Sequence, residues 1–521
     1  MTDASKGKGA RREFAADWPL WGCLLLIVAA QTQCAIAKDP KHGPFISVAD
    51  VFAAGLFALW FLARFEHPLL RSVRVLFFGI FGLVDLPEGQ RRLAWPPGVC
   101  WVFVTLAALS VGRADSSGAL RSGIFEVVQF GAYLICIWML VANVLRRPAA
   151  ADTAVRVLVG LTGLMVVYAL AQYATLLQGQ GDPVKLASTF GIGESIADTA
   201  IGKKLHLAGA STRSVYGNFL LMALPLTYGV LLGYQAPKVK VALGALIVLG
   251  ALTMMEGYHF WALLVVLLIM AAKAGPRVLG ATAATAAVVV AVLASGALAL
   301  NRQAGFAEVV DPWEQGVLDT EATTTTDVTA GGEMRTTTEI NKRWLELQAV
   351  VNGLGTANSY RDLALGVGAG GYQLHIGTFY GKVPNFKKIE PDTNSYFAVI
   401  AVSTGLFGLA AFLAIFWRQL GLATAARQAA ETTWRRGLAL GIWGAILAML
   451  PANLFSGVLV RGTAITMVLL LALADAMTAR APAPQPEAEP EPMAAPLQEE
   501  AEALPDGLRP EPERPGRPGR R

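Results

Sequence analysis

The sequence predicts an all-α polytopic membrane protein with about twelve transmembrane helices. Of its 521 residues, 54% are hydrophobic and only 16% are charged, and the mean hydropathy is +0.48. A soluble protein of this length needs a more polar surface to cover its core. In addition, apolar runs close to the ~20 residues of a bilayer-spanning helix recur along most of the chain.

Twelve apolar segments have the length expected of such helices. They lie at residues 18–37, 45–63, 96–112, 123–144, 155–177, 214–234, 239–255, 258–273, 277–300, 395–417, 437–457 and 460–479. The predicted membrane domain therefore covers residues 18–479, and a cytoplasmic segment at 1–17 precedes it. Basic residues before the first run and Ala35-Ile36-Ala37 after it resemble a cleavable signal peptide. We favour a retained first span, and the remaining topology is the same in both cases.

One further apolar run, Val73–Val84, is too short to cross a membrane comfortably. Its placement decides the orientation of the chain, because cytoplasmic loops carry an excess of lysine and arginine. With this run on the inner surface or re-entrant, most basic clusters face the cytoplasm. These clusters lie at residues 64–97, 146–156, 238–240, 273–277 and 418–436. The charge distribution therefore predicts twelve spans with both termini in the cytoplasm.

Two long hydrophilic segments, 178–213 and 301–394, then face outward, and the second precedes the third-last span. Connections of this length are usually functional or disordered. Within the second, residues 320–338 are Thr-rich and are predicted to be mobile, whereas 339–351 has the periodicity of an amphipathic helix. Residues 480–521 are dense in Pro, Glu and Ala and predict a disordered cytoplasmic tail.

Composition and spacing argue against several classes of function. The net charge of +5 is modest and reflects basic residues kept in the cytoplasm, so nucleic-acid binding is not predicted. No Cys/His cluster has the spacing of metal ligands, and no disulfide framework is implied. The Gly-rich turn at 365–372 lacks the Lys-Ser/Thr of a phosphate-binding loop and predicts a tight backbone turn. Neither a metal nor a cofactor is expected.

Charged and polar groups at the ends of the spans are the candidate functional residues, because such groups are costly inside a membrane. Glu256 and His259 lie at a tight outer turn, where the simpler interpretation is that both reach water. Arg213 stands where the loop 178–213 enters a span, and it would snorkel at the interface. Arg343 lies on the amphipathic segment, where a solvated helix face is the simpler interpretation. Arg361 precedes the Gly-rich turn and would cap the local structure.

The mouth of the third-last span carries a run of polar residues followed by two glycines: Asp392, Thr393, Asn394, Ser395, Gly405 and Gly408. Close packing of helices is the simpler interpretation of the glycines.

This motif resembles the O-antigen ligase and polysaccharide polymerase superfamily of bacterial membrane glycan transferases. The family signature is His, then Asn, Ser or Gln, nine residues, Gly, two residues and Gly; here the histidine is replaced by Asn394. Family members also have an Arg before a Gly/Asn-containing span entry, an Arg near a Trp-containing loop helix, and a later Gly-x-Gly turn. The matching residues are Arg213, Gly217 and Asn218; Arg343 and Trp344; and Gly366 and Gly368. The resemblance covers about 18–479.

The resemblance implies transfer or polymerisation of a glycan carried on undecaprenyl pyrophosphate, at the periplasmic face of the inner membrane. The acceptor would be another glycan or lipid A-core, and other polysaccharide-assembly proteins and membrane lipids are expected partners. Arg213 and Arg343 are the expected catalytic cations for the leaving pyrophosphate, because a guanidinium binds phosphate oxygens bidentately and keeps its charge. The residues expected to bind substrate are Arg361, Glu256, His259, Asn218 and Ser395.

Two positions depart from the family pattern. Asn394 cannot act as a general base, and Glu256 stands where the family has the Arg of a Thr-x-Ser-Arg sequence. Asp392, Glu256, His259 and Glu390 are the alternative bases, unless Asn394 only orients the sugar.

The sequence leaves other functions open. A transporter or flippase for a lipid-linked glycan would also suit twelve spans, although no span shows paired central carboxylates or a Pro/Gly-broken half-helix pair. An inactive relative with a scaffold role is a further alternative. Within the enzyme class, ligation, polymerisation and transfer to protein are not separable.

Overall fold

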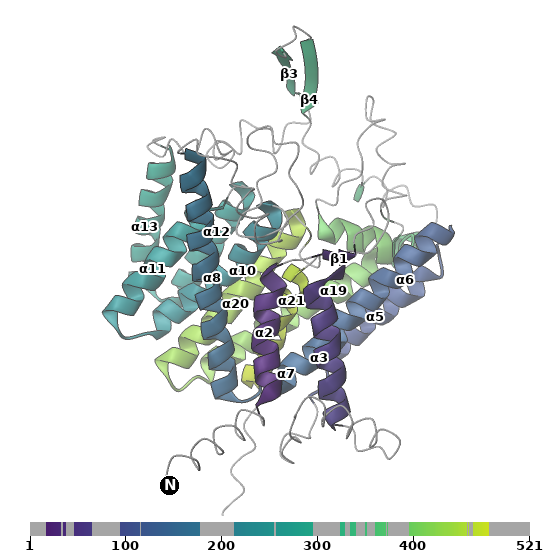
Figure 1. The fold of residues 1–521 in the computed structure, drawn as a ribbon, viewed down its shortest axis with the longest axis horizontal. Coiled ribbons are helices and arrows are strands. Elements are labelled where there is room, and N and C mark those ends of the chain that lie inside the picture. The colour runs from purple at the N-terminus through teal and green to yellow at the C-terminus, as the bar shows by residue number, and fades with distance from the viewer. Residues whose placement is uncertain are drawn as a thin grey trace, which may run out of the picture. The chain divides into compact units, whose positions relative to one another are not determined.

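A computed structural model describes residues 17–32, 35–37, 46–64, 94–114, 116–177, 213–254, 257–294, 323–328, 334–339, 350–351, 360–370, 372, 395–455, 457 and 462–478. Each of the twelve segments predicted as a span coincides with a helix or with a run of adjoining helices (Figure 1). The chain is therefore a helical protein in the part that the structure describes, with short strands between some helices.

The helices follow the chain in the order that the apolar runs predict. They are α2 (Trp18–Thr32), α3 (Val48–Arg64), α5 (Gly98–Val111), α6 (Ser117–Gly131), the π-helix η2 (Ala132–Ile137), α7 (Trp138–Val144), α8 (Pro148–Leu177), α10 (Arg213–Gly233), α11 (Pro237–Leu252), α12 (Gly257–Ala274), α13 (Pro276–Ala294), α17 (Tyr360–Leu365), α19 (Tyr396–Gln428), α20 (Thr433–Phe455) and α21 (Gly462–Thr478). α19 continues to Gln428, past its predicted end at residue 417.

Two short antiparallel hairpins depart from a purely helical chain. β1 (Ala35–Ala37) pairs with β2 (Ile46–Ser47), and β3 (Thr323–Val328) pairs with β4 (Met334–Glu339) in the register Thr323 to Glu339. The second hairpin lies in the Thr-rich segment 320–338, for which no regular structure was predicted. Threonine is β-branched and favours strands, so the runs of threonine on either side of the Gly-Gly sequence can pair.

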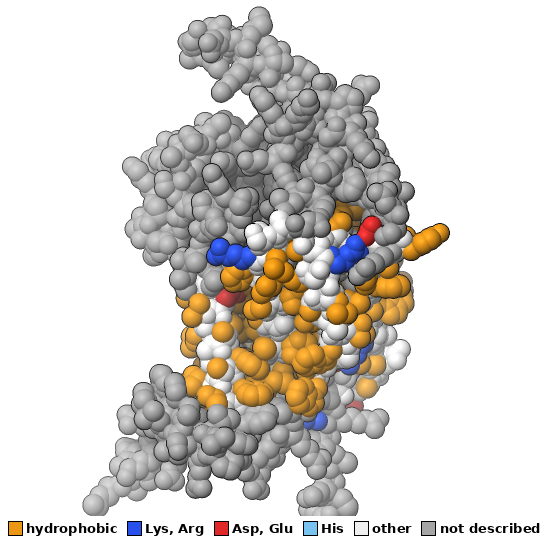
Figure 2. Space-filling model, turned by 90° about the vertical axis from the view of Figure 1, so that its right-hand side faces the viewer, with side chains coloured by type: hydrophobic (Ala, Val, Ile, Leu, Met, Phe, Trp, Pro, Cys, Tyr) orange, Lys and Arg blue, Asp and Glu red, His pale blue; other side chains and the backbone are white. Residues whose placement is uncertain are grey.

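The apolar helices identify a membrane-embedded protein. Among the residues that the structure describes, five helices are long and apolar enough to cross a membrane: Ser117–Val144, Pro148–Ala171, Val215–Gly233, Tyr396–Gln428 and Thr433–Leu454. Shorter apolar helices accompany them: Trp18–Gln31, Val48–Ala63, Gly98–Val111, Tyr258–Ala274, Pro276–Ala291 and Thr463–Thr478. Hydrophobic side chains cover most of the described part of the face in Figure 2. Exposed apolar side chains over so wide a surface suit contact with lipid.

α10 and α20 make the most extensive helix contact among the described residues. Gly229 and Gly233 of α10 face Gly437 and Gly441 of α20, so both helices present glycines four residues apart. The backbones lie so close that a Cβ added at Gly441 would approach the carbonyl oxygen of Leu226 to 2.8 Å. Small residues at this spacing allow close helix packing in membranes. α20 also packs against α19 and therefore connects α10 with α19.

The helix ends meet at two levels. At the level that we call the Asp17 end, Asp17 Oδ1 lies 2.6 Å from Arg147 Nη2, so α2 begins where α7 ends. Arg427, at the end of α19, donates a hydrogen bond of 2.6 Å to the carbonyl of Lys273, at the end of α12. The Asp17 end lies at the bottom of Figure 1.

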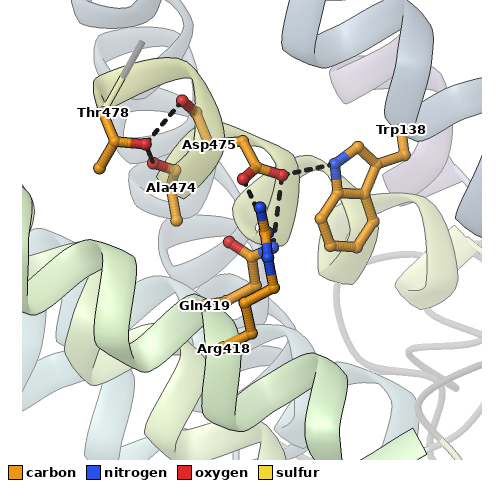
Figure 3. Close-up of polar contacts among 6 residues, drawn as sticks. All are labelled: Trp138, Arg418, Gln419, Ala474, Asp475 and Thr478. Carbon is orange, nitrogen blue, oxygen red and sulfur yellow. Dashed lines mark hydrogen bonds and ion pairs between the residues drawn. The ribbon is translucent and has the colours of Figure 1, made fainter. Parts of the chain in front are cut away.

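Figure 3 shows how α7, α19 and α21 are joined near the Asp17 end. The Asp475 carboxylate of α21 accepts hydrogen bonds from Trp138 Nε1 at 2.9 Å, Arg418 Nη1 at 2.9 Å and Gln419 Nε2 at 3.3 Å. Three helices that are distant in sequence thus share one acceptor group.

The described residues on either side of 65–93, Arg64 and Ala94, lie at the same level, on the Asp17 side. The β1–β2 pairing brings the end of α2 beside the start of α3, and these two helices pack together, so α3 ends at the level where α2 begins. Ala94, which precedes α5, exchanges two hydrogen bonds of 2.8 Å with the Asn143 side chain near the end of α7. A connection that returns to its own level suits the prediction that Val73–Val84 does not cross. That run itself lies outside the described residues.

Candidate functional site

The start of α10 and the start of α12 meet at the end opposite Asp17. His259 Nε2 lies 2.9 Å from Asn218 Oδ1, and both side chains are completely buried. As placed, the amide oxygen can only accept, so Nε2 carries the proton of this hydrogen bond. The interpretation that His259 simply reaches water is therefore wrong, because the ring is enclosed between α10 and α12.

Gly217 makes room for the His259 ring. A Cβ added at Gly217 would overlap the imidazole, so any larger residue would displace it. Arg213 is the first residue of α10 and lies four positions before Gly217, which places the two on the same face of the helix. Arg213 therefore stands one turn above the buried His259–Asn218 pair, although its side chain is not described.

A second hydrogen bond holds the turn between α11 and α12 against α10. The hydroxyls of Tyr216 and Thr253 lie 2.9 Å apart, and the Thr253 hydroxyl also donates to the carbonyl of Gly250 at 2.8 Å. The starts of two packed helices, α10 and α12, therefore converge here. Helix starts carry partial positive charge and unpaired N–H groups, which favour anions. Glu256, in the same turn, lies outside the described residues.

The Gly-rich turn forms a separate cluster between α5, α6 and α19. Gly366, Gly368 and Gly370 have φ values of 71°, 114° and 74°, a backbone region that favours glycine. Each of the five successive N–H groups from Gly366 to Gly370 has an acceptor. The acceptors are the carbonyls of Asp362, Val402 and Ser403, Ser110 Oγ and Glu126 Oε2, at 2.9, 2.8, 3.0, 3.0 and 2.7 Å. Because every donor is used, the turn joins helices and is not a cradle for phosphate.

α19 is broken where the turn docks. Gly405 has φ 72° and ψ −174° inside the helix, which leaves the carbonyls of Val402 and Ser403 outside the regular helical pattern. Val367 and Gly368 donate to these two carbonyls. Close packing alone therefore does not explain Gly405, because its backbone conformation itself requires glycine.

The remaining predicted residues lie at the start of α19, in α17 or outside the described ranges. Ser395 is the N-cap of α19, where its hydroxyl accepts from the Ala398 N–H at 3.4 Å, and its side chain is buried. Arg361 lies in α17, which packs on α19; its side chain is not described, and the neighbouring Asp362 pairs with Arg113, two residues after the end of α5. The predicted residues outside the described ranges are Glu256, Arg343, Asp392 and Asn394.

The structure therefore brings His259, Asn218 and the backbone of Arg213 together at the start of α10. It places Arg361 in α17, directly before the Gly-rich turn, and Ser395 at the start of α19. α20, which packs against both α10 and α19, connects the two groups. Within the described ranges, no group of three or more His, Cys, Asp and Glu side chains could hold a metal ion.

Sequence reasoning missed two acidic residues inside apolar helices. Glu126 of α6 accepts a hydrogen bond from the Gly370 N–H at 2.7 Å. Asp50 of α3 accepts one at 2.5 Å from the hydroxyl of Tyr133, which lies in the π-helix η2. Carboxylates within spans are rare and mark functional or structural sites, and π-helical turns often occur at functional sites. A search for acidic residues inside each apolar run would have found both.

A scan against models of protein families found no match to this chain, and a search of curated proteins found none either. The resemblance to the O-antigen ligase and polysaccharide polymerase superfamily therefore remains a prediction.

Proposed function

We propose that this protein transfers or polymerises a glycan carried on undecaprenyl pyrophosphate at the outer face of the bacterial inner membrane. The observation that carries the proposal is the arrangement at the start of α10, where Arg213 lies one turn above the buried His259–Asn218 pair. It coincides with the Arg-Gly-Asn part of the family resemblance. The order of the other motifs supports the proposal further.

The chemistry explains why an arginine is needed. An acceptor hydroxyl attacks the anomeric carbon of the donor glycan and loses its proton, while the bond to the lipid pyrophosphate breaks. The leaving pyrophosphate takes the bonding electron pair and its negative charge must be stabilised. In this proposal Arg213 and Arg343 bind its oxygens, aided by the helix starts of α10 and α12. Donors placed where charge develops contribute a few kcal/mol each.

The proton of the acceptor hydroxyl needs a base. We assign this step to Asp392, which lies three residues before the N-cap Ser395 in the sequence. His259 is a positioning residue in this proposal, because its ring is completely buried and its Nε2 is engaged by Asn218. Asn394 orients the sugar.

The proposal requires the start of α10 to face the periplasm. Reporter fusions after residues 90, 150, 275 and 430 are expected to report the cytoplasm, and fusions after 195 and 330 the periplasm, because lysine and arginine are retained inside. Paired phosphatase and fluorescent-protein fusions measure this. A periplasmic signal at 150 together with a cytoplasmic signal at 330 would reject the twelve-span topology.

Arginine-to-lysine variants test the chemistry. Arg213→Lys and Arg343→Lys are expected to lower glycan output about as strongly as the alanine variants, roughly 10²-fold or more, because lysine keeps the charge but loses the bidentate fork. The measurement is surface polysaccharide in a deletion strain carrying each variant, with membrane levels checked. Arg121→Lys, an exposed arginine of α6, is the matched control and should be silent. Normal output from both lysine variants would refute the proposed role, since lysine snorkels equally well.

The α19 break bears on the transporter alternative. Broken helices in transporters expose backbone carbonyls that bind ions. Here the carbonyls of Val402 and Ser403 accept hydrogen bonds from the Gly-rich turn. The break therefore does not favour a transporter over a glycan transferase.

A further inference from the structure

A cavity of ≈ 430 Å³ lies between α10, α11, α12 and α13. Its lining is almost entirely apolar, with side chains such as Ile247, Leu263 and Val289. The polar groups deep in it include the hydroxyls of Tyr228 and Thr282, which lie 2.7 Å apart and satisfy each other. An apolar cavity with paired polar groups suits a hydrocarbon chain.

The cavity has one charged lining residue, Arg277, at the start of α13. Along α13 the lining runs from Arg277 to Val289, about 18 Å at ~1.5 Å per residue. This is a little more than half of the ~30 Å hydrocarbon core of a bilayer. The cavity therefore has the depth of a single leaflet, with its cationic mouth at the Asp17 end.

The charged residues that α11, α12 and α13 carry at this end are all basic. Lys238 and Lys240 begin α11, Lys273 ends α12, and all three side chains are exposed, as is that of Arg277. The sequences of α10, α11, α12 and α13 contain no Asp or Glu. The chemistry of the mouth is therefore complementary to an anionic headgroup, and each nearby basic residue favours an anionic lipid.

We propose that this cavity binds one acyl chain of an anionic phospholipid from the leaflet at the Asp17 end, with the lipid phosphate at Arg277. The glycan donor is a different ligand, because in the proposed function its pyrophosphate lies at the opposite end, beside Arg213. The phospholipid site does not depend on that function. Its role is to fill the space between α10, α11, α12 and α13.

The test uses the full-length protein, purified in mild detergent from bacterial membranes, with bound lipids identified by native mass spectrometry after extensive washing. Wild type is expected to retain an anionic phospholipid. Ala286→Trp fills the cavity and should abolish retention, whereas Ala287→Trp, on the neighbouring exposed position outside the lining, should retain the lipid. If the Ala286→Trp protein does not accumulate, lipid retention is measured instead in Ala281→Leu, where a smaller side chain fills part of the same cavity.

The headgroup is tested by adding back phosphatidylglycerol or phosphatidylcholine and measuring binding to each. Arg277→Gln should weaken phosphatidylglycerol binding roughly fivefold and leave phosphatidylcholine unchanged, since one basic group near an anionic headgroup contributes on that scale. Arg435→Gln, an exposed arginine of α20 outside the lining, should change neither. Equal retention in Ala286→Trp and Ala287→Trp, a polyprenyl lipid in the cavity, or equal binding of both lipids by wild type would each overturn the proposal.

Discussion

Replacing Gly405 with alanine is expected to lower the thermal stability of the protein more than most single substitutions. Its backbone conformation, φ 72° and ψ −174°, is essentially restricted to glycine, and forcing another residue into it costs on the order of 1–3 kcal/mol. The added Cβ would also overlap the carbonyl of Ala364, just before the Gly-rich turn. Together, the two effects are expected to lower the free energy of unfolding by ~4 kcal/mol, a loss that few single substitutions reach. Unfolding of the purified protein in detergent, followed by intrinsic fluorescence, measures this.

Gly421→Ala is the matched control because Gly421 lies in the same helix and an added Cβ would meet nothing within 4 Å. It should gain about 0.5–1 kcal/mol, since alanine is the better helix former. Equal stabilities of the two alanine variants would show that α19 does not need the break at Gly405.

His259→Ala is expected to reduce glycan output roughly 10²-fold, because loss of the ring releases Asn218 and the α10 start that carries Arg213. His259→Gln should recover most of this activity, since its side-chain amide can still donate to the Asn218 oxygen. Gly217→Ala should resemble His259→Ala because the added methyl group displaces the ring. The assay is the same deletion strain and polysaccharide measurement.

The glutamine variant separates a positioning role from a catalytic one. A general base cannot be replaced by an uncharged amide, so equal loss in His259→Gln and His259→Ala would contradict positioning and identify His259 as the base. Gly163→Ala, where the nearest atom to an added Cβ is a Leu246 methyl at 3.8 Å, controls for the glycine substitution and should leave output unchanged.

The positions of the helices could be predicted from the sequence because each apolar run is long and is bounded by polar residues. The break at Gly405 could not, since a glycine in an apolar run is equally consistent with close packing. Its conformation depends on donors from Val367 and Gly368, which a local pattern does not reveal. The burial of His259 likewise depends on Gly217 and Asn218, which are some forty residues away in the sequence.

The candidate site was predictable only in part. Arg213 was found because it follows a long loop and Asn218 because it matches the family resemblance, and the structure places both on the first turns of one helix. Glu126 and Asp50 were missed because a single acidic residue in an apolar run has no spacing pattern that reveals its partner. Both accept hydrogen bonds from other elements, Gly370 and Tyr133, so their roles come from tertiary contacts.

The order of the chain has a consequence for biogenesis. The Gly-rich turn at 366–370 is synthesised before α19, so the N–H donors of Val367 and Gly368 exist before the carbonyls of Val402 and Ser403 that accept from them. A nascent α19 can therefore leave the translocon already broken at Gly405. It does not have to form a straight helix first and break later. Ser110 and Glu126, which hold the same turn, belong to α5 and α6 and are inserted earlier still. During co-translational insertion, the groups that hold the break are therefore in place before α19 is synthesised.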